Sequence, residues 1–112
     1  MIVALHSRLK EGTEEAYVQA HQAIPADLVA SFHRIGIHHW SIWRSGRSLF
    51  HLVECDDYVA AMTALQDDPA DEAWQERMRA YVDRFVGGEA GPAGQILPHV
   101  WSLSDQLAER DS

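Results

Sequence analysis

The chain has 112 residues, 46% of them hydrophobic and 23% charged, which is enough for one domain with a single core and too short for two. The formal net charge is −8, from 17 acidic and 9 basic residues. Such a surface repels a phosphate backbone, so nucleic acid is excluded as an expected partner. No apolar stretch approaches the length of a membrane span, and no signal segment opens the chain. We therefore expect a cytoplasmic protein with no membrane partner.

The first third of the chain predicts a strand followed by a broken helix. Side chains alternate between two faces across Ile2–Leu9, which predicts a strand. Thr13 is a good N-cap for a helix with acids in its first turn. Pro25 can begin a new helical turn but cannot continue the old one, so a second helix is expected, with Gly36 as its C-cap.

The middle of the chain predicts a β-hairpin and then two more helices. Ile37–Arg44 and Ser48–Cys55 are rich in aromatic and β-branched residues, and a short Gly-containing link joins them. The helix that follows is broken at Pro69, which starts another. On this last helix, a stripe at helical spacing is formed by Trp74, Met78, Tyr81 and Phe85.

The last quarter of the chain predicts a loop, a strand and a tail. Gly87 to Gly94 holds four glycines and a proline, so it is expected to be a loop. Ile96 to Leu103 is predicted to be the last strand, and Pro98 favours an edge position for it. The tail from Ser104 is polar, and we expect it to be frayed. The chain is therefore divided into a single domain over residues 1–104 and a C-terminal tail over residues 105–112.

The predicted order β-α-β-β-α-β fits the α+β class with one antiparallel sheet and helices on one face, the ferredoxin-like arrangement. The other face is left exposed, and Trp40, Trp43 and Trp101 indicate that it is aromatic. A second subunit is expected to cover it, which makes the protein a homodimer. Trp40 and Trp43 have opposite parity on their strand, so at most one of them can face a given pocket.

The seven histidines raise the question of a metal site. Their spacing argues against one, because His38 and His39 are adjacent on a strand and point to opposite faces. No H-x-H or HExxH pattern occurs, and the chain has one cysteine. We expect no metal, although spacing leaves open a site assembled from different strands by His6, His51 and His99.

Two features favour a sugar site. Tyr17 and His21 are four residues apart on a helix, so a phenol that can hold a sugar hydroxyl lies beside an imidazole that titrates near neutral pH. Tryptophan rings offer flat apolar surfaces that suit the C–H faces of sugars. The alternative is that Tyr17 packs in the core beside His21, and that the tryptophans serve the core or a dimer interface.

Four short segments carry a resemblance to a known family. They are EAYVQAH at residues 15–21, GIHHWSIW at 36–43, LFHLVE at 49–54 and WQERM at 74–78. In their order and spacing they resemble the L-rhamnose mutarotase family over residues 2–103. The resemblance implies a dimeric α+β barrel that interconverts the anomers of a free deoxy-sugar and needs no cofactor.

The resemblance also implies roles for particular residues. His21 matches the proton-donating histidine of the family, and Tyr17 matches a substrate-binding tyrosine. Trp74 matches the first residue of a tryptophan pair that contacts sugar. Trp40 stands where the family usually has tyrosine, and Gln75 stands where it has the second tryptophan, so both are substrate-binding candidates.

Three departures from the family pattern concern the sugar pocket. The first is Ile-Pro-Ala at residues 24–26 in place of Ile-Trp-Pro, and the others are Trp40 and Gln75. Because epimers differ in where their hydroxyls need partners, L-fucose competes with L-rhamnose as the expected substrate.

By the resemblance, His21 would donate a proton to the ring oxygen of the sugar. The opposite base stays open among His51, Glu54 and a bound water. Two other functions also stay open. One is a small dimeric α+β-barrel monooxygenase or haem-degrading protein, and the other is a non-catalytic dimeric binding module.

Overall fold

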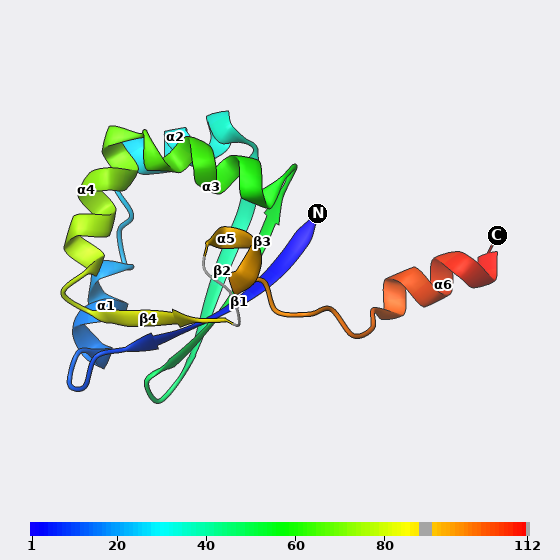
Figure 1. Ribbon diagram of the computed structural model, residues 1–112, viewed down its shortest axis with the longest axis horizontal. Helices are drawn as coiled ribbons and strands as arrows, with labels where there is room; N and C mark the ends of the chain where they lie inside the picture. The colour runs from blue at the N-terminus through cyan, green and yellow to red at the C-terminus, as the bar shows by residue number, and fades with distance from the viewer. Residues whose placement is uncertain (88–90, 112) are drawn as a thin grey trace.

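The computed structural model describes residues 1–87 and 91–111, which contain one antiparallel sheet of four strands. The strands lie in the order β2-β3-β1-β4, which is the ferredoxin-like order and confirms the predicted fold class (Figure 1). Their bounds are β1 (Ile2–Leu9), β2 (Ile37–Ser45), β3 (Ser48–Cys55) and β4 (Val82–Val86).

Four helices form an arc around one face of the sheet (Figure 1). They are α1 (Glu14–Ala20), α2 (Ala26–Ile35), α3 (Tyr58–Gln66) and α4 (Pro69–Met78). Local chemistry sets several of their ends. The Asp57 carboxylate caps α3 by accepting from the Ala60 N–H, and Asp68 caps α4. Helix α2 ends at Gly36, whose φ of 94° is a left-handed conformation that favours glycine.

Alternation along the strands separates an inner face from an outer face. On β1, Leu5 and Leu9 are fully buried under the helices, and on β3 the same is true of Leu49 and Val53. The helices contribute their own apolar side chains to this core, among them Tyr58 of α3, which is 2% exposed. The core therefore lies between the inner face of the sheet and the helical arc.

The fourth strand differs from its prediction. Helix α4 ends at Met78, and Val82–Val86 turns back to pair with β1, so Phe85 lies on a strand rather than on the predicted helical stripe. Residues 96–103 form no strand: Ile96 makes a single bridge to Leu5, and the Leu97 N–H donates to the Ala4 carbonyl. Both segments use the same edge of β1, and β4 takes the half from His6 to Leu9.

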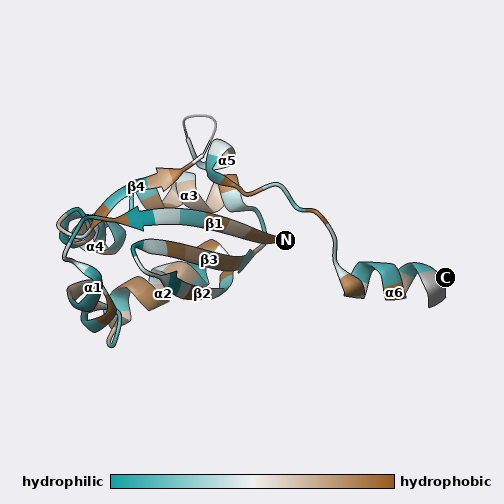
Figure 2. Ribbon diagram, turned by 90° about the horizontal axis from the view of Figure 1, so that it is seen from below, coloured by the Kyte–Doolittle hydropathy of each residue, from teal (hydrophilic) through white to brown (hydrophobic). Residues whose placement is uncertain are grey.

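The end of the chain also differs from its prediction. The predicted frayed tail is helical over α6 (Leu103–Asp111), which extends away from the body of the protein (Figures 1 and 2). Trp101 lies in the extended segment before α6 rather than on the sheet, and its indole N–H donates to Gln106. The predicted loop contains a short helix, α5 (Pro92–Gln95), and its residues 88–90 lie outside the described part of the chain.

Candidate functional site

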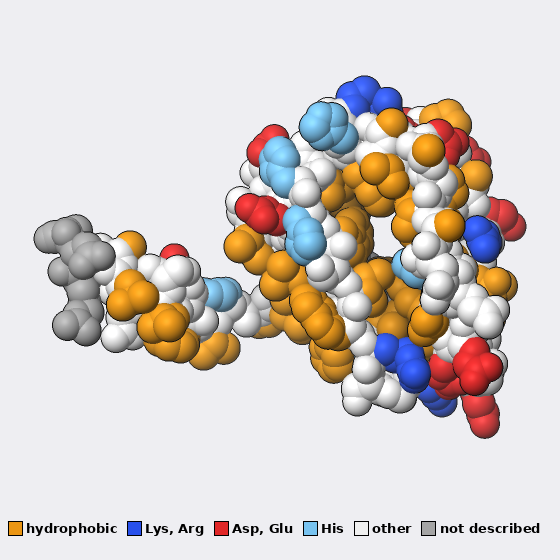
Figure 3. Space-filling model, turned by 180° about the vertical axis from the view of Figure 1, so that it is seen from behind, with side chains coloured by type: hydrophobic (Ala, Val, Ile, Leu, Met, Phe, Trp, Pro, Cys, Tyr) orange, Lys and Arg blue, Asp and Glu red, His pale blue; other side chains and the backbone are white. Residues whose placement is uncertain are grey.

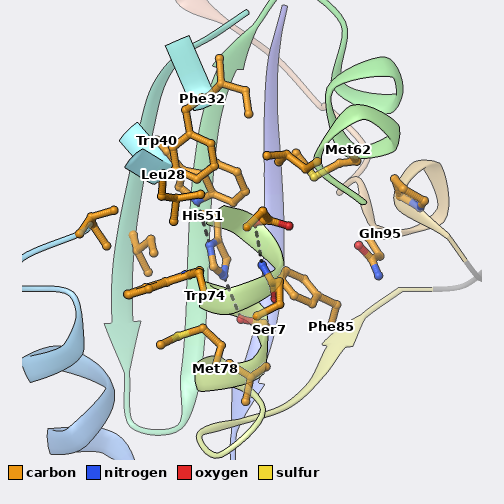
Figure 4. A pocket seen from close by; sticks show the side chains of 18 of the residues that line it. Ser7, Leu28, Phe32, Trp40, His51, Met62, Trp74, Met78, Phe85 and Gln95 are labelled. Carbon is orange, nitrogen blue, oxygen red and sulfur yellow. Dashed lines mark hydrogen bonds between the residues drawn. The ribbon is translucent and has the colours of Figure 1, made fainter. Parts of the chain in front are cut away.

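A cavity of about 930 Å³ lies between the inner face of the sheet and the helical arc. Figure 3 shows it as an opening framed by hydrophobic side chains. Its lining is mostly apolar and aromatic, and Figure 4 shows Phe32, Trp40 and Trp74 on one side and Phe85 on the other. A volume of this size is at the upper end of the roughly 300–1,000 Å³ typical of ligand sites.

Helix α1 places Tyr17 and His21 together on the wall of this cavity. The two rings have centroids 4.1 Å apart, as expected for residues one helical turn apart on one face. Tyr17 is 5% exposed, and burial raises its pKa to about 12, so the phenol keeps its proton at neutral pH. It can therefore both donate and accept a hydrogen bond.

The orientation of His21 follows from one hydrogen bond. Its Nδ1 lies 2.9 Å from the carbonyl oxygen of Tyr17, which can only accept, so Nδ1 carries a proton and donates it. Proton transfer is left to Nε2. Burial lowers the pKa of His21, the Tyr17 carbonyl opposes this, and the positive charge of Arg77 lowers it further.

One face of α4 forms the neighbouring wall. The side chains that line the cavity recur at helical spacing: Asp71, Trp74, Gln75 and Met78. The Trp74 ring meets His21 edge-on, with centroids 5.0 Å apart. The Gln75 amide donates to the Asp71 carboxylate over 3.4 Å. A flat indole, an imidazole and a hydrogen-bonding amide thus surround one end of the cavity.

Trp40, His51 and Ser7 form a chain of hydrogen bonds on the sheet side of the cavity (Figure 4). The Trp40 indole N–H can only donate, and it lies 3.2 Å from His51 Nδ1, so Nδ1 is the acceptor. His51 Nε2 then carries the proton and donates it to Ser7 Oγ at 2.9 Å. Burial, followed by the nearby His21 and His6, lowers the pKa of His51 to about 4.

The geometry argues against two of the candidates for the base opposite His21. His51 faces the cavity, but it is neutral at pH 7 and its one free lone pair accepts from Trp40, so it cannot take a proton from a substrate. Glu54 pairs with Ile2 and His39 on the outer side of the sheet and is exposed to solvent. Neither residue can serve as the base opposite His21.

The structure brings all five predicted site residues to the wall of this one cavity: Tyr17, His21, Trp40, Trp74 and Gln75. Trp40 points inward and Trp43, at 59% exposed, points outward, as their opposite parity predicted. Sequence reasoning missed Ser7 and Asp71. Both left a signal, because Ser7 is a polar residue at an inward strand position and Asp71 precedes Trp74 by one helical turn.

The histidines do not gather at one point. His6 lies on the outer face, where its ring stacks on Phe50 with centroids 4.8 Å apart, whereas His51 lies on the inner face. The three-strand metal site left open by the spacing is therefore wrong. Within residues 1–87 and 91–111, no three His, Cys, Asp or Glu side chains are placed to hold a metal ion. In the same part of the chain, every helix is too short or too polar to cross a bilayer.

Comparison with known proteins identifies the family. The model of the L-rhamnose mutarotase family matches residues 2–103. The chain belongs to the L-rhamnose mutarotase family. The family match ends at the first residue of α6, so this helix lies almost entirely beyond it. No curated protein matches the chain.

Solved structures agree with the mutarotase fold. An L-rhamnose mutarotase from Formosa agariphila is 18% identical with a TM-score of 0.72, over 92% of this chain and 98% of that one. Tetracenomycin F2 cyclase from Streptomyces glaucescens, a type II polyketide cyclase, is 17% identical with a TM-score of 0.59, over 91% and 95% of the two chains. At these identities the likeness is one of fold alone.

Proposed function

We propose that this member of the mutarotase family interconverts the anomers of a free deoxy-sugar, L-rhamnose or L-fucose, with His21 as the proton donor to the ring oxygen. The observation that carries the proposal is the shared cavity wall of Tyr17, His21 and Trp74. The family match over residues 2–103 supports the reaction class. A cytoplasmic location is part of the same proposal.

The proposed chemistry needs little beyond proton transfer. A pyranose opens when its ring oxygen gains a proton and its anomeric hydroxyl loses one, and it recloses on either face of the carbonyl. His21 supplies the first proton from its imidazolium form: Nδ1 keeps the proton that it donates to the Tyr17 carbonyl, and Nε2 carries the proton that goes to the ring oxygen. The Tyr17 phenol would hold a sugar hydroxyl, and the flat Trp74 ring would pack against the C–H groups of the sugar.

Two side chains of the pocket support a sugar preference different from that of a pocket with tyrosine at position 40 and a second tryptophan at position 75. The Trp40 N–H is already bound to His51, so Trp40 would present an apolar ring to the sugar rather than a hydroxyl group. Gln75 would supply an amide where a second tryptophan supplies an apolar wall. Lost and gained hydrogen-bond partners discriminate strongly between stereoisomeric sugars, which is the reason to keep L-fucose beside L-rhamnose.

We also propose a homodimer in which two outer sheet faces meet. Trp43 and Phe50 are direct cross-strand partners on this face and are 59% and 41% exposed, and Ile2, further along β1 on the same face, is 64% exposed. Adjacent exposed aromatic side chains of this kind are typical of a surface that a partner covers.

The test of the mutarotase proposal is anomer exchange measured by saturation-difference NMR on L-rhamnose, L-fucose and their epimers. His21→Ala should lower the exchange rate of the preferred sugar on the order of 10²–10⁴-fold, as expected for loss of a general acid. Gln22→Ala, the exposed neighbour, is the matched control and should exchange like the wild type. Wild-type rates in the His21→Ala variant would remove His21 from the reaction.

The size of the cavity favours a second candidate function, one with a ligand larger than a single sugar. At about 930 Å³, with Phe32, Met62 and Phe85 on its walls, it has room for a ligand larger than one pyranose. A haem or a substrate of similar size would fit such a space, which is the reason to keep an α+β-barrel monooxygenase or haem-degrading protein as the second candidate. Haem titration checks this directly, because a Soret shift would favour the second candidate. Absence of exchange for every sugar, together with no haem binding, would favour a non-catalytic binding module.

A further inference from the structure

Two buried aspartates, three residues apart at the start of α4, have opposite surroundings. Asp68 is 6% exposed and fully partnered: its carboxylate accepts from the N–H groups of Ala70 and Asp71 and forms an ion pair with Arg34 at 2.7 Å. These contacts, with a hydrogen bond from Ser31 foremost, lower its pKa. Asp68 therefore has a complete structural role as the N-cap of the helix.

Asp71 has no comparable partners. It is 8% exposed, and among the residues that the structure describes, its one side-chain hydrogen bond comes from the Gln75 amide over 3.4 Å. No described cation pairs with it, and burial raises its pKa, with Gln75 opposing and the negative charge of Asp68 adding to the rise. A carboxylate in this position destabilises the fold, because burial removes hydration that few hydrogen bonds replace.

Asp71 has few partners within the fold, but it faces the cavity. Asp71 lies one turn before Trp74 on the face of α4 that lines the cavity, and His21 contacts Trp74 from α1. The carboxylate and the imidazole thus line the same cavity from two adjoining elements. Two neighbouring carboxylates whose pKa values are pushed apart mark a division between structural and chemical roles.

We propose that Asp71 is the catalytic base that works opposite His21, taking the proton of the anomeric hydroxyl while His21 protonates the ring oxygen. The inference rests on the proposed mutarotase function. It assigns the base opposite His21, a role for which His51 and Glu54 are unsuited. The two oxygens that exchange protons, the ring oxygen and the anomeric hydroxyl oxygen, are bonded to the same carbon, so a sugar stacked on Trp74 presents them together.

The step balances without any other reactant. The step starts with His21 as the imidazolium and Asp71 as the carboxylate. As the bond from C1 to the ring oxygen breaks, its electron pair goes to that oxygen, which receives the Nε2 proton of His21 and leaves the imidazole neutral. Asp71 removes the proton of the anomeric hydroxyl, and the O–H electrons form the carbonyl bond. On reclosure from the other face, Asp71 returns its proton to the carbonyl oxygen and His21 recovers one from the chain hydroxyl. Besides the Nδ1 proton of His21, which stays in place, the pair holds one transferable proton throughout.

The decisive experiment compares Asp71→Asn with Asp68→Asn at pH 7, measuring anomer exchange and thermal unfolding on each. Asp71→Asn should slow exchange on the order of 10²–10⁴-fold and should melt at the same or a higher temperature than the wild type, because a poorly solvated charge has gone. Asp68→Asn, the matched control, should melt at a lower temperature and keep the wild-type exchange rate per folded molecule.

The outcomes separate this inference from the proposed function. Wild-type exchange in Asp71→Asn, with exchange abolished in His21→Ala, would overturn the role of Asp71 and leave the mutarotase function intact. Loss of both folding and exchange in Asp71→Asn would also overturn it, because the residue would then be structural. If the wild type exchanges no sugar, the proposed function itself fails. Slow exchange in a well-folded Asp71→Asn supports the base.

Discussion

His21 and His51 line the same cavity, yet their hydrogen bonds give them different chemistry. His21 has one nitrogen bound to a backbone carbonyl and the other available. Both nitrogens of His51 are engaged, one by Trp40 and one by Ser7. An imidazole with a free nitrogen can exchange a proton with a ligand. An imidazole that is hydrogen-bonded at both nitrogens has none available and instead holds its two partners in place. The residue type alone does not separate these roles.

His51 should make the stability of the protein depend on pH. Its pKa falls from 6.5 to about 4 on folding, so the folded state resists protonation, and this contribution is present above pH 6.5 and lost as the pH falls toward 4. Since one pKa unit corresponds to 1.36 kcal/mol, the expected loss is on the order of 3 kcal/mol. Urea unfolding between pH 7 and pH 4 should show this loss in the wild type.

His51→Leu removes the titrating group while keeping a side chain of similar volume. The variant should be less stable at pH 7, because the Trp40 N–H and the Ser7 hydroxyl lose their partner. Its free energy of unfolding should then fall less steeply than that of the wild type between pH 7 and pH 4. Equal slopes in the two proteins would show that His51 does not titrate in this range.

At the scale of elements, the junction between α2 and β2 depends on one glycine. Gly36 ends α2 with a φ of 94°, and a Cβ placed there would lie 2.6 Å from Oδ2 of Asp56. The other oxygen of Asp56 forms a hydrogen bond with His38 at 2.7 Å, so displacement of the carboxylate would disturb that pair as well. Two features therefore require glycine at position 36: its left-handed backbone conformation and the close approach of the Asp56 carboxylate.

Gly36→Ala should lower the free energy of unfolding by at least about 1–2 kcal/mol, the cost of a left-handed conformation with a side chain, plus the cost of displacing Asp56. Gly12→Ala is the matched control, because Gly12 has a φ of 81° with open space around it and bears the backbone cost alone. Chemical denaturation of both variants checks the difference. Equal losses would mean that the approach of Asp56 has no energetic consequence.

The element scale also shows where sequence reasoning fails. The first three strands were predicted correctly, because alternation and the hairpin link are local signals. The fourth strand was misplaced because two segments compete for one edge of β1. Val82–Val86 pairs along one half of that edge. Ile96 and Leu97 make one contact each with the other half, and Pro98, which has no N–H to donate, follows them. Such competition depends on the folded sheet.

For the whole molecule, the proposed dimer predicts that charge on the outer face breaks association. Trp43→Lys should convert a dimer into a monomer in analytical ultracentrifugation, because the lysine would have to be buried against the second subunit. Val59→Lys is the control: Val59 lies on α3, on the opposite side of the sheet from Trp43, and is 44% exposed. A wild-type protein that sediments as a monomer would contradict the proposal.

Local sequence patterns were sufficient to predict the α+β class, the first three strands, the break between α3 and α4, and the shared helical face of Tyr17 and His21. These follow from periodicity, caps and proline, which act between residues close in the chain. The fourth strand, the neutral state of His51 and the contrast between Asp68 and Asp71 became visible in the folded chain and not before. Each of these depends on burial and on hydrogen-bond partners that distant segments bring together, and no local pattern encodes them.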